Sequence, residues 1–482
     1  MGTAYRDTMT IIDAFNDALG VVNTYVWYVA FILLIGAGLY FTYKLRGLQI
    51  LKIRETAKLA LSGIGEGDKT EAVSSFEAFC IGVGTRVGVG NIAGVAMAIV
   101  AGGPGAVFWM WVFAIIGSAS SFVESTLSQL FKEKKEDGQY HGGPAYYIQK
   151  GLGTRKVAIL MAFLIAMMTG IGFCAAQASS SVEALTSTFV FDNNTLVFGL
   201  VITILTGLII FGGMKRIATF SSKIVPLMAV AWLALGTITI VMNIEGLINA
   251  FVMIFSYAFG FEQVAGGLLG AVIMTGLKRG IFSNESGLGT IANIAGTADV
   301  KHPVKQGLIQ CFGTLVDTLV VCTFTAMVIL TAFDDYGAIL DTGLSNSPLV
   351  EYILNDTIGH IGSILMSLFL LFFAFTSLLG NYAISETNVR FISDRKMSIM
   401  VMRIAVVVTV FIASLIGADA SILISDTIMA FAGVVNISCV ILLSGLAFQA
   451  YADWRKQKSE GIEDPVFHRD TLDDATGITE WE

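Results

Sequence analysis

Long apolar stretches recur along the chain between short polar segments, and eleven of them reach the length of a membrane span. A helix needs about 20 consecutive apolar residues to cross roughly 30 Å of hydrocarbon. The pattern therefore predicts an all-α integral membrane protein with about eleven transmembrane helices. Their expected limits are 25–45, 76–101, 104–131, 155–186, 195–213, 216–242, 246–277, 304–332, 358–391, 398–418 and 420–449.

Lysine and arginine are concentrated in every second polar segment, which indicates the orientation of the helices. Of the 29 basic residues, 27 are Lys44 or lie in six alternate segments. These segments are 46–75, 132–156, 214–223, 278–305, 390–403 and 455–482. Because positively charged loops stay in the cytoplasm, we expect a multi-pass protein of the plasma membrane, with its N-terminus outside and its C-terminus in the cytoplasm.

The composition excludes a water-soluble globule. Of the 482 residues, 55% are hydrophobic and only 14% are charged, whereas a soluble domain has about 25% charged residues. The net charge of −8 does not indicate a particular partner. The five cysteines lie within apolar runs and lack metal-ligand spacing, so we expect them to be packing residues.

The second apolar stretch contains a run that an ordinary membrane helix would avoid, GVGTRVGVGNIAGVA at 82–96. Four of its first nine residues are glycines, each of which weakens a helix by about 1 kcal/mol. Arg86 lies about 15 Å into the membrane at 1.5 Å per residue. A charge at that depth normally faces a cavity or a partner. The clustering predicts a broken helix beside a polar cavity.

A second interruption is expected near Gly260, where glycines surround Glu262 and Gln263 about 24 Å into the seventh stretch. The two interrupted stretches run in opposite directions, five spans apart, which predicts two inverted repeats of five helices. Paired interruptions of this kind mark the substrate site of secondary transporters. The expected parts are an extracellular segment 1–24, an extra helix 25–45, repeats 76–242 and 246–449, and a cytoplasmic tail 450–482.

Two other classes of protein agree less well with the sequence. Three of the four histidines lie outside the expected spans and His360 lies at the start of one. There is also no HExxH motif or phosphate-binding loop, so we do not expect an enzyme. A channel would also need polar groups at the midplane, but it usually builds its pore from several subunits. One long chain with two broken helices favours a carrier.

These glycine-rich motifs resemble those of the alanine or glycine:cation symporter family, in the family's order and over nearly the whole chain. The motifs are GVGNIAGVA (88–96), AGGPGAVFWMW (101–111), GGPAYYIQKGLG (142–153), KRGIFSNESGLGTIANIAG (278–296), HPVKQG (302–307), DTLVVCT (317–323) and FAFTS (373–377). The family is similar in architecture to the LeuT fold, which agrees with two inverted repeats.

The resemblance implies a secondary active transporter that carries small neutral amino acids into the cell together with sodium. Alanine, glycine and glutamine are the expected substrates, and Na⁺ is the expected co-transported ion. A proton-coupled amino acid symporter is the alternative. We expect a monomeric transport unit surrounded by membrane lipid, with no nucleic-acid partner.

The resemblance also implies a sodium site between the second and ninth helices. Carbonyl groups of Gly84 and Val87 would coordinate Na⁺ together with the hydroxyl groups of Thr376 and Ser377. The carbonyl of Phe373 is a further candidate. Hydrogen bonding of the two hydroxyl groups to preceding carbonyls of their own helix is the alternative interpretation.

The same resemblance predicts the substrate contacts. The N–H groups of Val89 and Gly90 would bind the carboxylate, and the carbonyls of Arg86 and Gly260 are candidates for binding the ammonium group. The remaining candidates for the pocket are Asn91, Phe173, Gln177, Phe259 and Gln263. For the two aromatic residues, packing between helices is the alternative role, and Asn91 could instead hold the broken segment together.

One position departs from the family's pattern. Many members resemble TTILGW in the ninth helix, whereas this chain has TSLLGN, which ends in Asn381. Asparagine in place of tryptophan removes bulk and adds a hydrogen-bonding amide. We therefore expect Asn381 to allow a larger polar side chain, such as that of glutamine, into the pocket.

Several charged residues and segments carry further expectations. Arg86 needs a partner, for which Glu262 and Asp317 are the candidates, and Asp426 could belong to an extracellular gate. Glu124 and Glu386 are expected toward the cytoplasmic side. Residues 7–19 are amphipathic and expected on the outer surface, 141–153 are expected to form an interfacial helix, and the charged tail from Arg455 is expected to be mobile.

Overall fold

The computed structural model describes residues 2–62, 73–135, 138–260, 267–416 and 418–481. Within these ranges the protein is helical almost throughout. Its one pair of strands there is β1 (Glu133–Lys134) with β2 (Tyr140–His141), which are antiparallel and two residues long. The expectation of an all-α membrane protein is confirmed.

Within the described ranges, eight helices are long and apolar enough to span a membrane, or nine if one bent pair counts as a span. Six of the eight are single helices: α1 (Gly2–Lys44), α6 (Gly105–Leu130), α11 (Met214–Met242), α19 (His360–Ile392), α20 (Lys396–Ile416) and α21 (Ala418–Ser459). The other two each consist of three consecutive helical segments: α8 (Arg155–Met167), η3 (Met168–Phe173) and α9 (Cys174–Thr188) in one, and α15 (Pro303–Leu315), η5 (Val316–Cys322) and α16 (Thr323–Leu330) in the other. The bent pair is α4 (Ser75–Arg86) followed by η2 (Gly90–Gly94) and α5 (Val95–Gly102).

Two of the expected spans consist of shorter helices, so the exact count of eleven stays a prediction. These helices are α10 (Asn194–Ile210), η4 (Ile244–Gly246), α12 (Leu247–Ala258) and α13 (Gly267–Asn284). The remaining helices are shorter or lie outside the expected spans: α2 (Leu48–Leu51), α3 (Ile53–Leu61), α7 (Pro144–Gly151), α14 (Thr290–Ala295), α17 (Tyr336–Asp341), α18 (Asn346–Ile358) and η6 (Arg469–Thr471). Helix α7 confirms a helix within 141–153, and residues 7–19 are part of the single helix α1.

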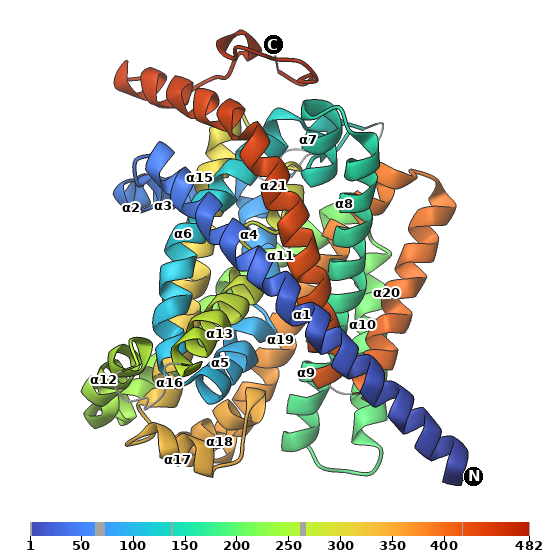
Figure 1. Cartoon of the computed structure of the whole chain (residues 1–482), viewed down its shortest axis with the longest axis vertical. Helices are drawn as coiled ribbons and strands as arrows, with labels where there is room; N and C mark the ends of the chain where they lie inside the picture. Colours follow the sequence, from blue (N-terminus) through green and yellow to red (C-terminus); the bar gives the residue numbers. More distant parts are fainter. Residues whose placement is uncertain (1, 63–72, 136–137, 261–266, 417, 482) are drawn as a thin grey trace.

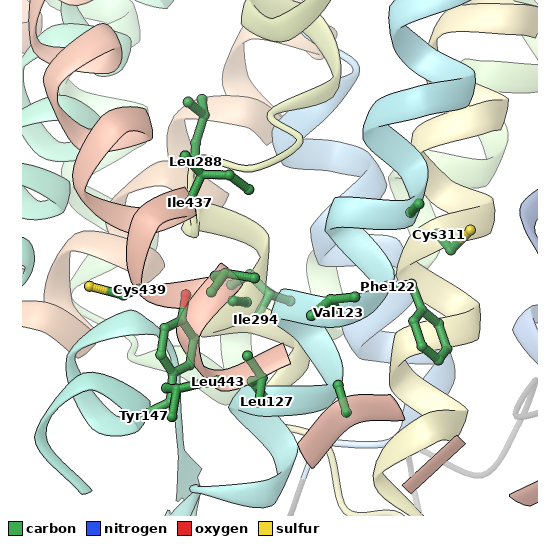
Figure 2. Packing of buried hydrophobic residues seen from close by; sticks show 14 of the residues in the cluster. Phe122, Val123, Leu127, Tyr147, Leu288, Ile294, Cys311, Ile437, Cys439 and Leu443 are labelled. Atoms are coloured by element: carbon green, nitrogen blue, oxygen red, sulfur yellow. The ribbon is translucent and has the colours of Figure 1, made fainter. Parts of the chain in front are cut away.

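Small residues allow the helices to approach closely, as is usual between membrane helices. A methyl group on Gly38 of α1 would lie 2.9 Å from the carbonyl oxygen of Ile116 in α6. Larger apolar side chains fill the space between α6, α7 and α21, where Leu127, Tyr147 and Leu443 lie together (Figure 2). Helix α6 is therefore a central packing element.

The seventh span differs from its expected limits of 246–277. Helix α12 stays beside the beginning of α6, where the indole of Trp109 donates to the carbonyl of Ala258 at 3.0 Å. It also contacts α17, since the rings of Tyr257 and Tyr336 are 5.4 Å apart. Figure 1 shows α12, α17 and α18 at the same end of the molecule as the N-terminus. Gly260 follows α12 with a φ of 75°, a left-handed conformation that favours glycine.

Helix α13 follows, and it carries two basic residues that were expected in a cytoplasmic segment. The ammonium group of Lys278 donates to Asn23 of α1 at 3.0 Å, and Arg279 forms a buried ion pair with Asp426. Gly260 lies directly after α12, and the interruption expected around Glu262 and Gln263 stays a prediction, because those two residues lie outside the described ranges. Local hydropathy did not place Lys278 and Arg279 inside a helix, because these two charges have partners inside the protein.

The tail after α21 is also different from the expectation of a mobile segment. The side chains of Phe467, Leu472, Ile478 and Trp481 are buried. The indole of Trp481 donates to the carbonyl of Gln129 at the end of α6, at 3.0 Å. Four apolar side chains among many charges are enough to fix the tail on the protein, at the end opposite the N-terminus (Figure 1).

Candidate functional site

The site is built around the break between α4 and η2. Helix α4 ends at Arg86, and the axes on either side of the break differ by 50°. The ends of helices leave backbone N–H and C=O groups without partners inside the helix. The predicted break in the second span is thus confirmed, and it exposes both donors and acceptors within a few residues.

The two glycines in the break permit close packing. A methyl group on Gly88 would lie 2.9 Å from side-chain atoms of Gln177 and Ser377, and one on Gly90 would lie 3.0 Å from the ring of Phe282. The break is therefore enclosed by α9, α19 and the end of α13. This explains why the sequence has glycine rather than alanine here.

Two backbone N–H groups at the break donate hydrogen bonds to side-chain amide oxygens. The N–H of Val89 donates to Oε1 of Gln177 at 3.0 Å, and the N–H of Gly88 donates to Oδ1 of Asn91 at 3.0 Å. Gln177 and Asn91 are both buried. The oxygen of Gln177 therefore lies where a carboxylate oxygen would accept the same hydrogen bond.

Hydroxyl groups of α19 lie against the other side of the break. The hydroxyl of Ser377 donates to the carbonyl of Thr85 at 2.8 Å, so it contacts α4 directly. The hydroxyl of Thr376 donates to the carbonyls of Phe372 and Phe373, both at 3.1 Å. A methyl group on Gly84 would be 3.7 Å from Cβ of Thr376. Oxygen atoms from α4 and α19 thus lie close together.

A second break, which was not expected from the sequence, faces the first one. It lies between α13 and α14, where Gly287 and Gly289 both have a φ of 79°. The carboxylate of Glu124 accepts hydrogen bonds from their N–H groups at 3.3 and 3.1 Å, and from the amide of Asn436 at 2.9 Å. The motif SNESGLG gave a usable signal, but the neighbouring basic residues led to its assignment as a loop.

Asp317 connects three of these elements. Its carboxylate accepts hydrogen bonds from the amide of Asn91 at 2.6 Å, from the hydroxyl of Ser283 at 2.6 Å and from the hydroxyl of Thr318 at 3.0 Å. Asn91, Phe173 and Asp317 lie in the π-helical segments η2, η3 and η5, respectively. Segments of this kind are frequent at functional sites.

The buried side chain of Arg86 links α4 to neighbouring helices by hydrogen bonds. Its guanidinium donates to the carbonyl of Asn284 at 3.0 Å, to Gln310 at 3.3 Å and to the hydroxyl of Ser121 at 3.1 Å. These partners are all uncharged. Glu262, a partner that we expected for Arg86, and Gln263 lie outside the described residues.

Two aromatic side chains pack beside the first break. The rings of Phe173 and Phe282 are 5.4 Å apart in an edge-to-face arrangement. The guanidinium of Arg279 lies 5.5 Å from the Phe282 ring and is paired with Asp426. The aromatic pair and the ion pair therefore lie next to each other, on the side of the break toward the N-terminal end of α1.

The structure does not bring all the predicted residues together. Phe259 is 48% exposed and packs against Phe108 at 5.0 Å, beside the beginning of α6. Gly260 follows it, so neither residue joins the group around the break. Asn381 does join it: its amide donates to the carbonyl of Ser377 at 2.9 Å. Among the described residues, the buried Oδ1 of Asn381 has no hydrogen-bond partner.

Comparisons with known proteins agree with this architecture. A sequence model described as the sodium:alanine symporter family matches residues 12–469. The chain is similar to the probable sodium/glutamine symporter GlnT of Bacillus subtilis, with 43% identity over 96% of this chain and 95% of that protein. It is also similar to the amino-acid carrier protein AlsT of Bacillus subtilis, with 40% identity over 97% of this chain and 98% of that protein.

A solved structure shares the fold. The crystal structure of MhsT in complex with L-phenylalanine superimposes with a TM-score of 0.53 at 15% identity, and the match covers 84% of this chain and 94% of that one. This likeness confirms the expected LeuT-like architecture.

Proposed function

Since the chain belongs to the sodium:alanine symporter family, we propose that it carries Na⁺ and a small neutral amino acid together into the cell by alternating access. The observation that carries this proposal is a pair of hydrogen bonds at one break. The N–H of Val89 donates to the side-chain oxygen of Gln177, and the nearby carbonyl of Thr85 accepts from the hydroxyl of Ser377. Such a break offers donors to a carboxylate and oxygen atoms to a cation.

The substrate carboxylate takes the place of the Gln177 oxygen on the N–H of Val89, and Gly90 provides the neighbouring N–H group. The first turn of a helix attracts negative charge because its N–H groups and dipole point outward. The carbonyl of Arg86, at the end of α4, accepts from the ammonium group. The 3.0 Å hydrogen bond from the Val89 N–H to the Gln177 side-chain oxygen supports this exchange, because it shows that the N–H group is accessible to an acceptor outside its own helix.

Na⁺ binds between α4 and α19. Its ligands are the carbonyl oxygens of Gly84, Val87 and Phe373 and the hydroxyl oxygens of Thr376 and Ser377. Carbonyl and hydroxyl oxygens suit a hard cation. The 2.8 Å hydrogen bond from Ser377 to the carbonyl of Thr85 supports this position, since it already joins the two helices. Binding of Na⁺ there orders the break that receives the carboxylate, which couples the ion to the substrate.

Alternating access requires closures on both sides of the site that can open in turn. Toward the N-terminal end of α1, Phe282 packs on Phe173, and the pair of Arg279 with Asp426 lies next to it. On the opposite side, Lys215 of α11 pairs at 3.1 Å with Glu77 in the first turn of α4. We assign the first closure to the outside and the second to the cytoplasm, following the distribution of basic residues.

Asn381 adjusts the pocket for an amide-bearing substrate. Its buried Oδ1 has no partner among the described residues, and it lies one helical turn from Ser377. An unsatisfied buried acceptor costs free energy, and a side-chain amide of the substrate can satisfy it. Similarity to a protein named as a probable sodium/glutamine symporter also supports glutamine as a substrate, beside alanine and glycine.

Equilibrium binding tests this proposal without requiring transport. Radiolabelled L-alanine is added to the purified protein in detergent, in NaCl or in choline chloride at equal ionic strength, and unlabelled glutamine competes. We expect saturable binding in NaCl only, with competition by glutamine. Equal binding in choline chloride would refute sodium coupling, and the lack of competition by glutamine would refute the role of Asn381.

A further inference from the structure

The segment that follows α1 has the properties of a helix lying in the membrane surface. Over residues 44–61 it has five basic residues and one acidic residue. Its exposed apolar side chains include Ile50 at 57% and Leu51 at 76% exposure. Amphipathic helices of this composition lie at the boundary between headgroups and acyl chains. From this pattern we expect the short helices α2 and α3 to lie at the membrane surface.

A cavity of about 290 Å³ lies between this segment, α15 and the last turns of α21. Three of its lining residues are the cations Lys52, Arg455 and Lys458, and one is the carboxylate Glu55. Glu55 is paired with Lys52 at 3.2 Å. The cavity therefore has an excess of positive charge, which comes mainly from α21.

Aromatic side chains hold the two cations of α21. The guanidinium of Arg455 lies 5.9 Å from the ring of Tyr451, and the ammonium group of Lys458 lies 5.4 Å from the ring of Trp454. Trp454 is itself buried against His302, with a ring distance of 5.0 Å. Each contact of a cation with an aromatic ring is worth about 0.5–1 kcal/mol at an exposed site, so the two rings help to hold the cations at the wall of the cavity.

We propose that this cavity binds the phosphate headgroup of an anionic phospholipid, with the acyl chains lying along the exposed apolar side chains of α2 and α3. Arginine binds phosphate oxygens in pairs of hydrogen bonds. Basic pockets beside membrane helices on the cytoplasmic side attract anionic headgroups. A free phosphate ion would use the cations alone, whereas a lipid also covers Ile50 and Leu51. Lipid binding here would tie the segment after α1 to the end of α21.

Thermal stability of the purified full-length protein tests the proposal. Phosphatidylglycerol, phosphatidylcholine and sodium phosphate are added separately in detergent, and the Tm is measured. The variant K52Q/R455Q is compared with R395Q/K396Q, which removes two positive charges near the start of α20. We expect only phosphatidylglycerol to raise the Tm of the wild type and the control, and we expect this rise to be lost in K52Q/R455Q.

Three results would overturn the proposal: an equal rise with phosphatidylcholine, an equal rise with sodium phosphate, or a full rise in K52Q/R455Q. Native mass spectrometry gives an independent readout of bound phosphatidylglycerol. There we expect K52Q/R455Q to bind at least about tenfold more weakly than the control. If K52Q/R455Q does not fold, the single variant K458Q is used, and unchanged lipid binding in K458Q would count against the proposal.

Discussion

Gly88→Ala tests whether the amino acid and Na⁺ share one break in the second span. The added methyl group would lie 2.9 Å from both side-chain polar atoms of Gln177 and 2.9 Å from the hydroxyl of Ser377. Ordinary contacts between non-bonded carbon atoms are about 3.5–4.0 Å. Both side chains must therefore move away by several tenths of an ångström, one on the amino-acid side and one on the ion side.

The expected size of the effect follows from the contacts that this movement breaks. The hydrogen bond from Ser377 to Thr85 is lost, which is worth about 1 kcal/mol. The bond from Val89 to Gln177 is not counted, because the substrate carboxylate replaces it. Overpacking adds about 1–3 kcal/mol. Because about 1.4 kcal/mol corresponds to a tenfold change in affinity, we expect the apparent affinities for alanine and for Na⁺ both to fall at least about tenfold.

The assay is binding of radiolabelled alanine at varied Na⁺ concentration, with Gly94→Ala as the matched control. Gly94 ends the π-helical segment η2 that follows Gly88 in the chain, and an added methyl group there would meet no atom within 4 Å. We expect Gly94→Ala to bind like the wild type. Unchanged binding by Gly88→Ala, or an equal loss in both variants, would refute the shared break.

Four further predictions concern single residues. Thr376→Ala should raise the Na⁺ concentration for half-maximal uptake, whereas Thr376→Ser should not. Asn381→Trp should reduce glutamine uptake more than alanine uptake. Trp481→Ala should lower the Tm, since truncating a buried tryptophan costs about 3–5 kcal/mol, and Trp481→Phe should lower it less. Burial lowers the pKa of His302 to about 4, against the opposing effect of Asp453. Between about pH 4 and the unfolded pKa of about 6.5, the unfolded chain binds more protons than the folded protein. The stability of the fold should therefore fall as the pH drops from about 6.5 to about 4, and His302→Gln should make stability less dependent on pH in this range.

Each of these predictions has a contrary outcome. An unchanged Na⁺ dependence in Thr376→Ala would remove that residue from the ion site. Equal losses of both substrates in Asn381→Trp would mean that position 381 does not select the side chain. An unchanged Tm in Trp481→Ala would mean that the tail adds no stability. The same slope of Tm against pH in wild type and His302→Gln would exclude that histidine as the titrating group.

The local pattern of residues predicted the first break and most of the helices. Glycine spacing around Arg86 located the end of α4, because flexible backbone and a buried charge both leave a local signal. The contacts of Arg86 could not be predicted, since its partner Gln310 is 224 residues away in the chain. Likewise, the hydrogen bond from Asn91 to Asp317 spans 226 residues.

Charge and composition were misleading in two places for the same physical reason. Lys278 and Arg279 resembled a cytoplasmic loop, but Asn23 and Asp426 provide partners for them within the protein. The tail resembled a solvated segment, but a few apolar side chains such as Trp481 bury themselves against distant helices. In both cases tertiary contacts outweigh the average property of the segment.

Uptake of radiolabelled L-alanine into proteoliposomes is the most direct test of sodium-coupled symport. An inward Na⁺ gradient is compared with equal Na⁺ on both sides and with an inward proton gradient without Na⁺. We predict accumulation above the external concentration with the Na⁺ gradient alone. Accumulation driven by the proton gradient in the absence of Na⁺, or no accumulation by protein that binds alanine, would contradict the account.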